Sequence, residues 1–242
     1  MLYGIIADIH SNLEAFQAVL RQLPAVDRIV CAGDIVGYGP NPNECLELMR
    51  EKGITSVAGN HDKAATGELS TQWFNVNARL AIEWTTSQLT TANGNYLKSL
   101  PVNLELDDFQ VVHGSLRDPL EEYIFNMDEA AETIKLMSKP LCIVGHTHRP
   151  LYAGLKPSGS LDGHTLGKND NVALKHYNKT VINPGAVGQP RDSDPRASYG
   201  VLDTDKNDFT LHRIEYDVAA VQQKMRTAKL PEQLIERLVY GT

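Results

Sequence analysis

Short apolar runs rich in β-branched residues recur along the chain, and most of them end in a glycine or a polar residue such as Asp or His. Runs of this length and composition are typical of buried β-strands. The runs are LYGIIAD at 2–8, DRIVCAGD at 27–34, ITSVAGN at 54–60, FQVVHG at 109–114, LCIVGH at 141–146, TVINPG at 180–185, ASYGVLD at 197–203 and FTLHRIEY at 209–216.

Amphipathic patterns separate the first of these strands. In residues 11–23 apolar side chains recur at helical spacing, and residues 41–53 carry Pro42 near their start and Gly53 at their end. Both patterns are typical of helices. The order strand, helix, strand, helix, strand therefore predicts an α/β sheet in the first part of the chain.

Strands dominate from residue 141 onward, and we expect them to form a second sheet packed on the first. Residues 156–170 are rich in Gly, Ser, Asp and Lys, which predicts a surface loop or a hairpin tip. Residues 215–239 predict two closing helical segments on either side of Pro231. No internal repeat is visible.

Length and charge limit the functional classes. A chain of 242 residues with 42% hydrophobic content can bury one sizeable core, so we expect a single domain over residues 1–242. A net charge of -7 without a dense basic run argues against stable binding to nucleic acid. An acidic surface still permits a small anionic substrate, because bound metal ions can reverse the local field.

The cysteines and the first ten residues indicate in which cellular compartment the protein is expected. Cys31, Cys45 and Cys142 form no CxxC pair, and this sparse, odd number fits a reducing environment. The opening MLYGIIADIH has no basic lead and reaches Asp8 too early for a signal peptide, and no apolar run approaches membrane-spanning length. We therefore expect a cytoplasmic protein with no membrane contact.

Residue types that bind metals follow several of the predicted strands. Ligands of open α/β sheets bind beyond the carboxyl ends of the strands, so these side chains are expected to share one edge. Five of the eight histidines lie at such positions, whereas His164, His176 and His212 do not. The candidates are Asp8, His10, Asp34, Asn60, His61, His113, His146 and His148.

Taken singly, each motif has an ordinary structural explanation. DIH can be a polar turn, GDIVG can be a tight turn, and Asn60 and Asp62 can cap the next helix. A lone His113 fits a hydrogen-bonded loop, whereas the two histidines of GHTH can point to one centre. The presence of all five motifs in this order favours a shared metal site.

The motifs resemble the ordered signature of the calcineurin-like metallophosphoesterases, which is DxH, GDxxG, GNHD, a lone His and GHTH. This signature stands at residues 8–10, 33–37, 59–62, 113 and 145–148, and no part of it is missing. The segment INPGAVGQPRDSDPRASYGVLD also resembles the closing part of the small bacterial members. The resemblance implies an α/β fold, a four-layer α-β-β-α sandwich of two mixed sheets.

The resemblance further implies two metal ions. One ion would be bound by Asp8, His10, Asp34 and His148, and the other by Asp34, Asn60, His113 and His146, with Asp34 bridging. Imidazole and carboxylate ligands without a thiolate suit manganese, iron, nickel or zinc. Two such ions can clamp a phosphoryl group and lower the pKa of a shared water toward about 7. The resulting hydroxide would attack phosphorus in line.

The GNHD motif adds residues with separate roles. Asn60 supplies a neutral ligand, so it adds no negative charge facing an anionic substrate. His61 remains outside the ligand set but next to it, and general acid for the leaving oxygen is its expected role. Asp34 shares in catalysis as the bridging ligand. Asp62 either orients His61 or caps the following helix.

The second motif bears on the substrate. Protein serine/threonine phosphatases of this superfamily carry GDxxDRG, whereas this chain has Gly37 and Tyr38 at the Asp-Arg positions. Tyr38, beside two prolines, is expected to form a rigid lip whose aromatic face meets a base or aryl group, although a plain surface loop fits as well. Arg191 and Arg196 are candidates for contact with a second phosphate, and solvated loop arginines are the alternative.

These features together predict a metal-dependent phosphoesterase that acts on a small phosphodiester or nucleotide-like substrate, with Asn60, Tyr38 and Arg191 in contact with it. They resemble the small bacterial phosphodiesterases and the diadenosine polyphosphate hydrolases. The alternatives are a phosphomonoesterase or protein phosphatase, and a binding scaffold of the same fold such as the retromer subunit. Retention of His61 and of every ligand argues against the scaffold. The oligomeric state is left open.

Overall fold

Twelve strands are present in the computed structural model, which describes residues 1–242. Six of them form the first sheet: β1 (Leu2–Ile6), β2 (Arg28–Cys31), β3 (Thr55–Ser56), β9 (Asn171–Ala173), β11 (Ala197–Asp203) and β12 (Asp208–Ile214). The other six form the second sheet: β4 (Asn103–Glu105), β5 (Phe109–Val112), β6 (Leu141–Ile143), β7 (Leu151–Leu155), β8 (Leu161–Thr165) and β10 (Lys179–Asn183). Their orders are β3-β2-β1-β11-β12-β9 and β4-β5-β6-β10-β7-β8.

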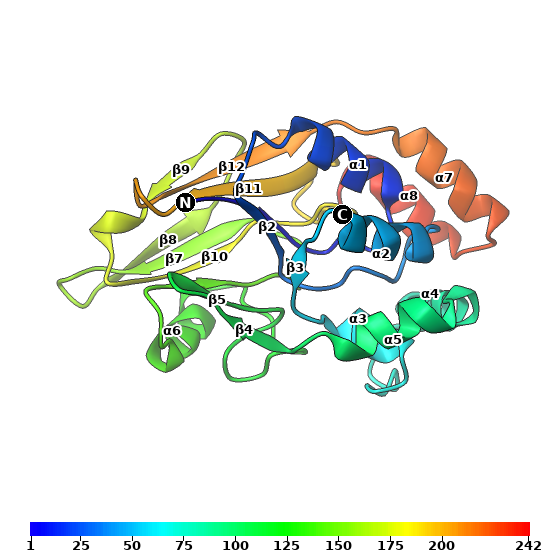
Figure 1. Cartoon of the computed structure of the whole chain (residues 1–242), viewed down its shortest axis with the longest axis horizontal. Coiled ribbons are helices and arrows are strands. Elements are labelled where there is room, and N and C mark those ends of the chain that lie inside the picture. Colours follow the sequence, from blue (N-terminus) through cyan, green and yellow to red (C-terminus); the bar gives the residue numbers. More distant parts are fainter.

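Helices pack on the outer faces of both sheets (Figure 1). The helices are α1 (Leu13–Gln22), α2 (Pro42–Glu51), α3 (Asn60–Ala65), α4 (Val76–Gln88), α5 (Thr91–Ser99), α6 (Met127–Leu136), α7 (Val218–Thr227) and α8 (Glu232–Tyr240), and a 3-10 turn covers Leu174–His176. Helix α1 contacts β11 and β12 of the first sheet, and α6 contacts β7, β8 and β10 of the second. None of the helices is long and apolar enough to cross a membrane.

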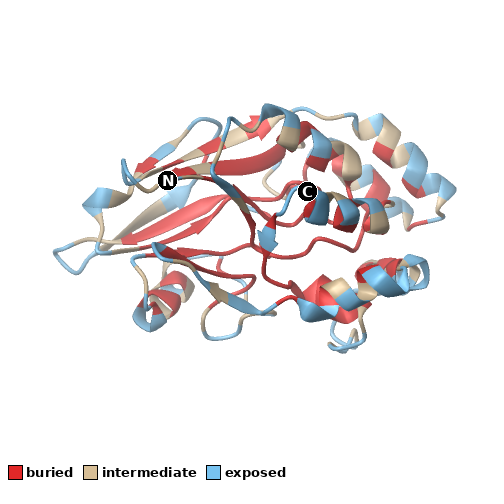
Figure 2. Cartoon of the chain, in the orientation of Figure 1, coloured by how far each residue is buried: buried red, intermediate tan, exposed pale blue.

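Buried apolar clusters between the layers hold this arrangement together. Between the sheets, Ile5 and Val30 of the first sheet share a buried cluster with Phe109 and Ile143 of the second. Phe16 of α1 belongs to a separate cluster between the first sheet and its helices. Buried residues follow the strands and their connecting loops toward the middle of the molecule (Figure 2). The predicted α-β-β-α sandwich of two mixed sheets is confirmed.

The assignment of strands to sheets differs from the sequence-based expectation. Strands β11 and β12 do not join the second sheet, because β11 pairs antiparallel with β1 and β12 pairs with β11. Strands β4 and β5 belong to the second sheet although they precede residue 141. Residues 156–170 form the expected hairpin tip, but 161–165 continue as strand β8 against β7. A local apolar pattern identifies strands and carries no information about their partners.

The parallel strands bring their connecting loops to one edge. Strands β1, β2 and β3 are parallel in the first sheet, and β5, β6 and β10 are parallel in the second. Their carboxyl ends therefore carry loops 7–12, 32–41, 57–59, 113–126, 144–150 and 184–196. Every candidate metal ligand lies on these loops or, for Asn60, at the first residue of α3.

Candidate metal centre

All seven proposed ligands are buried and lie close together. Their exposed fractions range from 0% at Asp8, Asp34 and His113 to 7% at Asn60. Two groups of side chains have ligand atoms within 4.8 Å of one another: Asp8, His10, Asp34 and His148, and Asp34, His113 and His146. Asn60 joins the second group, since its Oδ1 lies 3.1 Å from His113 Nε2. This division matches the one that the motif resemblance implies.

Left-handed backbone conformations aim several of these side chains. Eleven non-glycine residues have positive φ, and five of them are proposed ligands, with φ between 48° and 67°: Asp8, His10, Asp34, His146 and His148. Such conformations cost about 1–3 kcal/mol each and persist only where the surroundings enforce them, often at functional sites. The local sequence pattern did not indicate this strain.

A backbone carbonyl fixes the orientation of each ligand histidine. The Nδ1 of His10 donates to Val36 O (3.1 Å), that of His113 to Ala32 O (2.8 Å), and that of His148 to Gln189 O (2.6 Å). His146 is turned the other way, because its Nε2 donates to Glu121 O (3.2 Å). The unprotonated nitrogens therefore face the centre, which is the usual arrangement around metal-binding histidines.

These inward atoms lie within about 3 Å of one another in two pairs. Nε2 of His10 lies 3.0 Å from Nε2 of His148, and Nε2 of His113 lies 3.1 Å from Nδ1 of His146. Asp34 Oδ2 lies 3.5 Å from His10 Nε2 and 3.3 Å from His113 Nε2, yet it is buried without a hydrogen bond. Converging lone pairs and an unsatisfied carboxylate oxygen are what divalent cations would satisfy.

Burial and mutual charge shift the protonation equilibria of the cluster. Burial raises the pKa of Asp8 to about 7 and lowers the pKa of His10 and His148 well below the usual histidine value. Burial alone would raise the pKa of Asp34 and lower that of His113. The attraction between the two side chains outweighs burial, so it holds the pKa of Asp34 well below its usual range and raises that of His113 to about 9. A metal ion would satisfy the carboxylates and leave the imidazoles neutral.

Comparison with known proteins agrees with this centre. The model of the calcineurin-like phosphoesterase superfamily domain matches residues 1–207. The chain belongs to this family. It is therefore a phosphoric ester hydrolase with a buried Asp and His cluster suited to divalent metals.

Two relatives are similar to the phosphoesterase over nearly its whole length, and a third over a shorter segment. A metallophosphoesterase from Sphaerobacter thermophilus has a crystal structure that is 46% identical, with a TM-score of 0.91 and 100% of both chains covered. An uncharacterised protein of Methanocaldococcus jannaschii is 38% identical over 99% of this chain and 98% of its own. Serine/threonine-protein phosphatase 1 of Salmonella typhimurium is 36% identical over 64 residues, which are 25% of this chain and 30% of its own.

His61 lies beside the ligands of the phosphoesterase, and its side chain makes no hydrogen bond. Its Nδ1 is buried without a partner, and a Cβ added to Gly37 would lie 2.4 Å from it. The ring packs against the rings of His10 and Tyr38, with centroid distances of 4.8 and 4.4 Å. Burial lowers the pKa of His61 to about 4, with Asp34 opposing. Because Nδ1 is enclosed, Nε2 is the atom that remains available to a substrate.

Asp62 caps its own helix. Its Oδ2 accepts from Gly59 N (2.9 Å), the residue before α3, and its Oδ1 accepts from Val36 N (3.0 Å). Both oxygens are thus engaged by backbone amides, and Asp62 makes no hydrogen bond to His61. Of the two roles considered for Asp62, the contacts favour the cap, which joins the second and third motif loops.

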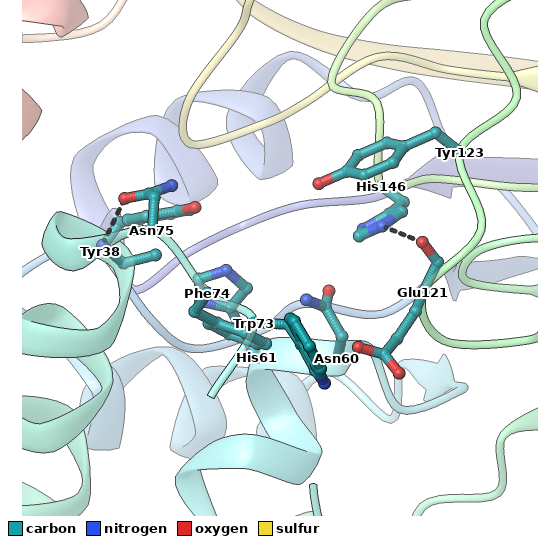
Figure 3. Close-up of a pocket in the computed structure, with 10 residues that line it drawn as sticks. Tyr38, Asn60, His61, Trp73, Phe74, Asn75, Glu121, Tyr123 and His146 are labelled. Carbon is teal, nitrogen blue, oxygen red and sulfur yellow. Dashed lines mark hydrogen bonds between the residues drawn. The ribbon is translucent and has the colours of Figure 1, made fainter. Parts of the chain in front are cut away.

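A cavity of about 380 Å³ opens against this centre (Figure 3). It is lined by Tyr38, Asn60, His61, Trp73, Phe74, Asn75, Ala78, Glu121, Tyr123 and His146. Figure 3 shows Tyr123 and His146 on one side of it and Trp73 with the carboxylate of Glu121 on the other. Motif spacing found Asn60, His61, Tyr38 and His146, but it gave no signal for the aromatic and acidic loop residues.

The structure places the remaining candidates around the rim. Tyr38 lines the cavity, but it is only 5% exposed and its ring contacts His10, His61 and the guanidinium of Arg191, which lies 5.5 Å from the ring centroid. Arg191 donates to Gln189 Oε1 (2.9 Å) and has no carboxylate partner. Arg196 is instead paired with Asp194 (2.6 Å). Tyr38 therefore offers little open ring face, and Arg191 is the arginine left available.

Proposed function

We propose that the phosphoesterase binds two transition-metal ions and hydrolyses a small phosphodiester or nucleotide-like substrate. The position of Asp34 carries this proposal, because Asp34 belongs to both groups of ligands and its unsatisfied Oδ2 lies near His10 of one group and His113 of the other. One carboxylate that faces two sets of imidazoles is the arrangement expected of a bridging ligand. The donor set, imidazole and carboxylate with no thiolate, suits manganese, iron, nickel or zinc.

The ions would supply Lewis acidity toward the phosphoryl oxygens and a water of lowered pKa as nucleophile. Asp8, His10, Asp34 and His148 would hold one ion, and Asp34, Asn60, His113 and His146 the other. Asn60 is the neutral member, so its group of ligands carries less negative charge toward an anionic substrate. Its Oδ1 faces His113, and its amide lines the cavity, where it can donate to a phosphoryl oxygen.

His61 is the proposed acid. It lines the cavity, its Nδ1 is enclosed by Gly37, and its ring is fixed between His10 and Tyr38, so Nε2 can hold the proton that the leaving oxygen takes. With a pKa near 4 the ring is neutral at pH 7, and an adjacent anionic phosphoryl group favours its protonation. Arg191, without a carboxylate partner, is the candidate for a further phosphate.

We propose that residues 1–242 form one domain. Helices α7 and α8 extend beyond the matched 1–207, but Val221 and Leu234 of these helices share a buried cluster with Tyr38. The last helices therefore support the wall of the cavity.

A substrate panel tests the proposed function. Metal-free protein would be reconstituted with single metals and assayed on phosphodiesters, phosphomonoesters, dinucleoside polyphosphates and phosphopeptides. We expect the highest kcat/KM on diesters or nucleotide-like substrates, since Gly37 and Tyr38 replace the Asp-Arg pair of protein phosphatases. A clear preference for phosphopeptides, or activity on monoesters alone, would show the substrate assignment to be wrong.

A further inference from the structure

One wall of the cavity offers an unoccupied aromatic face. Trp73, in the loop before α4, is 84% exposed although it lines a cavity next to His61 and Asn60. Tyr123 differs, because its ring stacks on His146 at a centroid distance of 3.9 Å and on Phe125 at 5.1 Å. Tyr123 thus already stacks on two rings, whereas Trp73 contacts no other aromatic ring and is the residue free to stack on a ligand.

The charge of the cavity restricts what can enter it. No Lys or Arg lines it, and its single carboxylate belongs to Glu121, an exposed residue whose hydrogen bonds are made by its backbone. The carbonyl of Glu121 accepts from His146, which fixes this residue at the edge of the metal centre. The carboxylate would repel a second phosphate here, whereas it can accept hydrogen bonds from a neutral group that carries donors.

We propose that this cavity binds a nucleoside esterified to the reacting phosphoryl group, with its base stacked on Trp73 and its ribose hydroxyls donating to Glu121. The proposal rests on the proposed phosphodiesterase function and names its substrate class. An exposed indole face matches the π-face of any base, and a carboxylate accepts from both hydroxyls of a vicinal diol. Further phosphates would extend away from this cavity, toward Arg191.

Three nitrophenyl diesters with the same leaving group test the assignment: the esters of adenosine 5'-monophosphate, of methyl phosphate and of phosphorylcholine. Trp73→Ala should lower kcat/KM for the adenosine ester by about 10- to 100-fold, the usual effect of losing one base stack, and leave the methyl ester within twofold. Glu121→Gln should cost about 10-fold on the adenosine ester and nothing on its 2',3'-dideoxy analogue.

Matched variants control for general damage. Trp84→Phe changes the other tryptophan, which lies in α4 outside this cavity, and Glu47→Gln changes an exposed glutamate of α2. Both should hydrolyse all three esters as the unchanged protein does. Equal losses on the adenosine and methyl esters, or a selective loss on the phosphorylcholine ester, would overturn the nucleoside assignment.

A binding measurement separates this inference from the proposed function. The chain has two tryptophans, so the Trp84→Phe protein carries Trp73 as its only indole. Titration of that metal-free protein with adenosine should quench its fluorescence, and ribose should not. Quenching without any diesterase activity would support the nucleoside subsite while contradicting the proposed function. Absence of quenching in a protein that hydrolyses diesters would contradict the subsite alone.

Discussion

His61 shows how a single side chain can be separated from the ligands that surround it. Its Nδ1 is enclosed against Gly37 and its neighbours Asn60 and Asp62 serve other contacts, so its proposed contribution is the proton for the leaving group. The effect of losing an acid depends on how much the leaving oxygen needs a proton. The effect of losing a metal ligand does not depend on the leaving group in this way.

His61→Asn should retain the metals and slow an alkyl phosphodiester by about 10²- to 10⁴-fold. The loss should shrink for a nitrophenyl ester, whose leaving oxygen departs readily as an anion. Kinetics on both esters, with metal content measured in the same samples, check this. Metal loss, or equal slowing of both esters with metal intact, would reassign His61 to metal binding or to contact with the phosphoryl oxygens.

Asp34 is expected to be the most sensitive ligand. Its Oδ2 faces both groups of imidazoles, so Asp34→Asn removes one negative charge from two sites at once. We expect a larger loss of bound metal than from any other single ligand change. Asp108→Asn, at an exposed aspartate, is the control. Two metals per chain and full activity in Asp34→Asn would rule out the bridge.

At the turn into α3, Gly59 leaves room for the carboxylate of Asp34 because it has no side chain. A Cβ on Gly59 would lie 2.0 Å from Asp34 Oδ1, the oxygen that accepts from His61 N at 2.9 Å. The backbone of Gly59 has an ordinary negative φ, so an alanine there is excluded by contact alone.

Gly59→Ala should therefore displace the Asp34 carboxylate and weaken metal binding by about 10- to 100-fold, as changes around metal ligands commonly do. Metal titration followed by calorimetry measures it. Gly94→Ala in α5 has open space around the new methyl group and should bind metal normally. Unchanged metal affinity in Gly59→Ala would show that the carboxylate tolerates another position.

The elements also show what could be predicted from the sequence. Asp8, Asp34 and His113 could be predicted because each directly follows an apolar strand pattern, which is visible in the sequence alone. The pairing of β11 with β1 was missed because strand order depends on contacts between residues far apart in the chain. Trp73 and Glu121 were missed because they lie on loops whose position is set by the fold.

At the scale of the molecule, the centre joins the two sheets. Asp8 and Asp34 follow strands of the first sheet, whereas His113 and His146 follow strands of the second. Ions held between them would bind the folded state and not the separated sheets, so metal should stabilise the whole chain.

Chelation should accordingly lower the Tm by about 5–10 °C relative to a sample whose free metal concentration is about 100 times Kd. This range follows from the linkage energy and a chain of this size. Calorimetry with and without chelator measures the shift. Asp34→Asn should show a much smaller shift. An equal shift in both proteins would place the stabilising metal elsewhere.

We expect hydrolysis to require two ions at one centre. Metal-free protein would be titrated with Mn²⁺ while bound ions per chain and phosphodiesterase activity are measured at each step. We expect activity to rise to a plateau as the second ion binds, with the unchanged protein holding two ions and Asp34→Asn fewer. Full activity at one ion per chain, or undiminished activity with none, would contradict it.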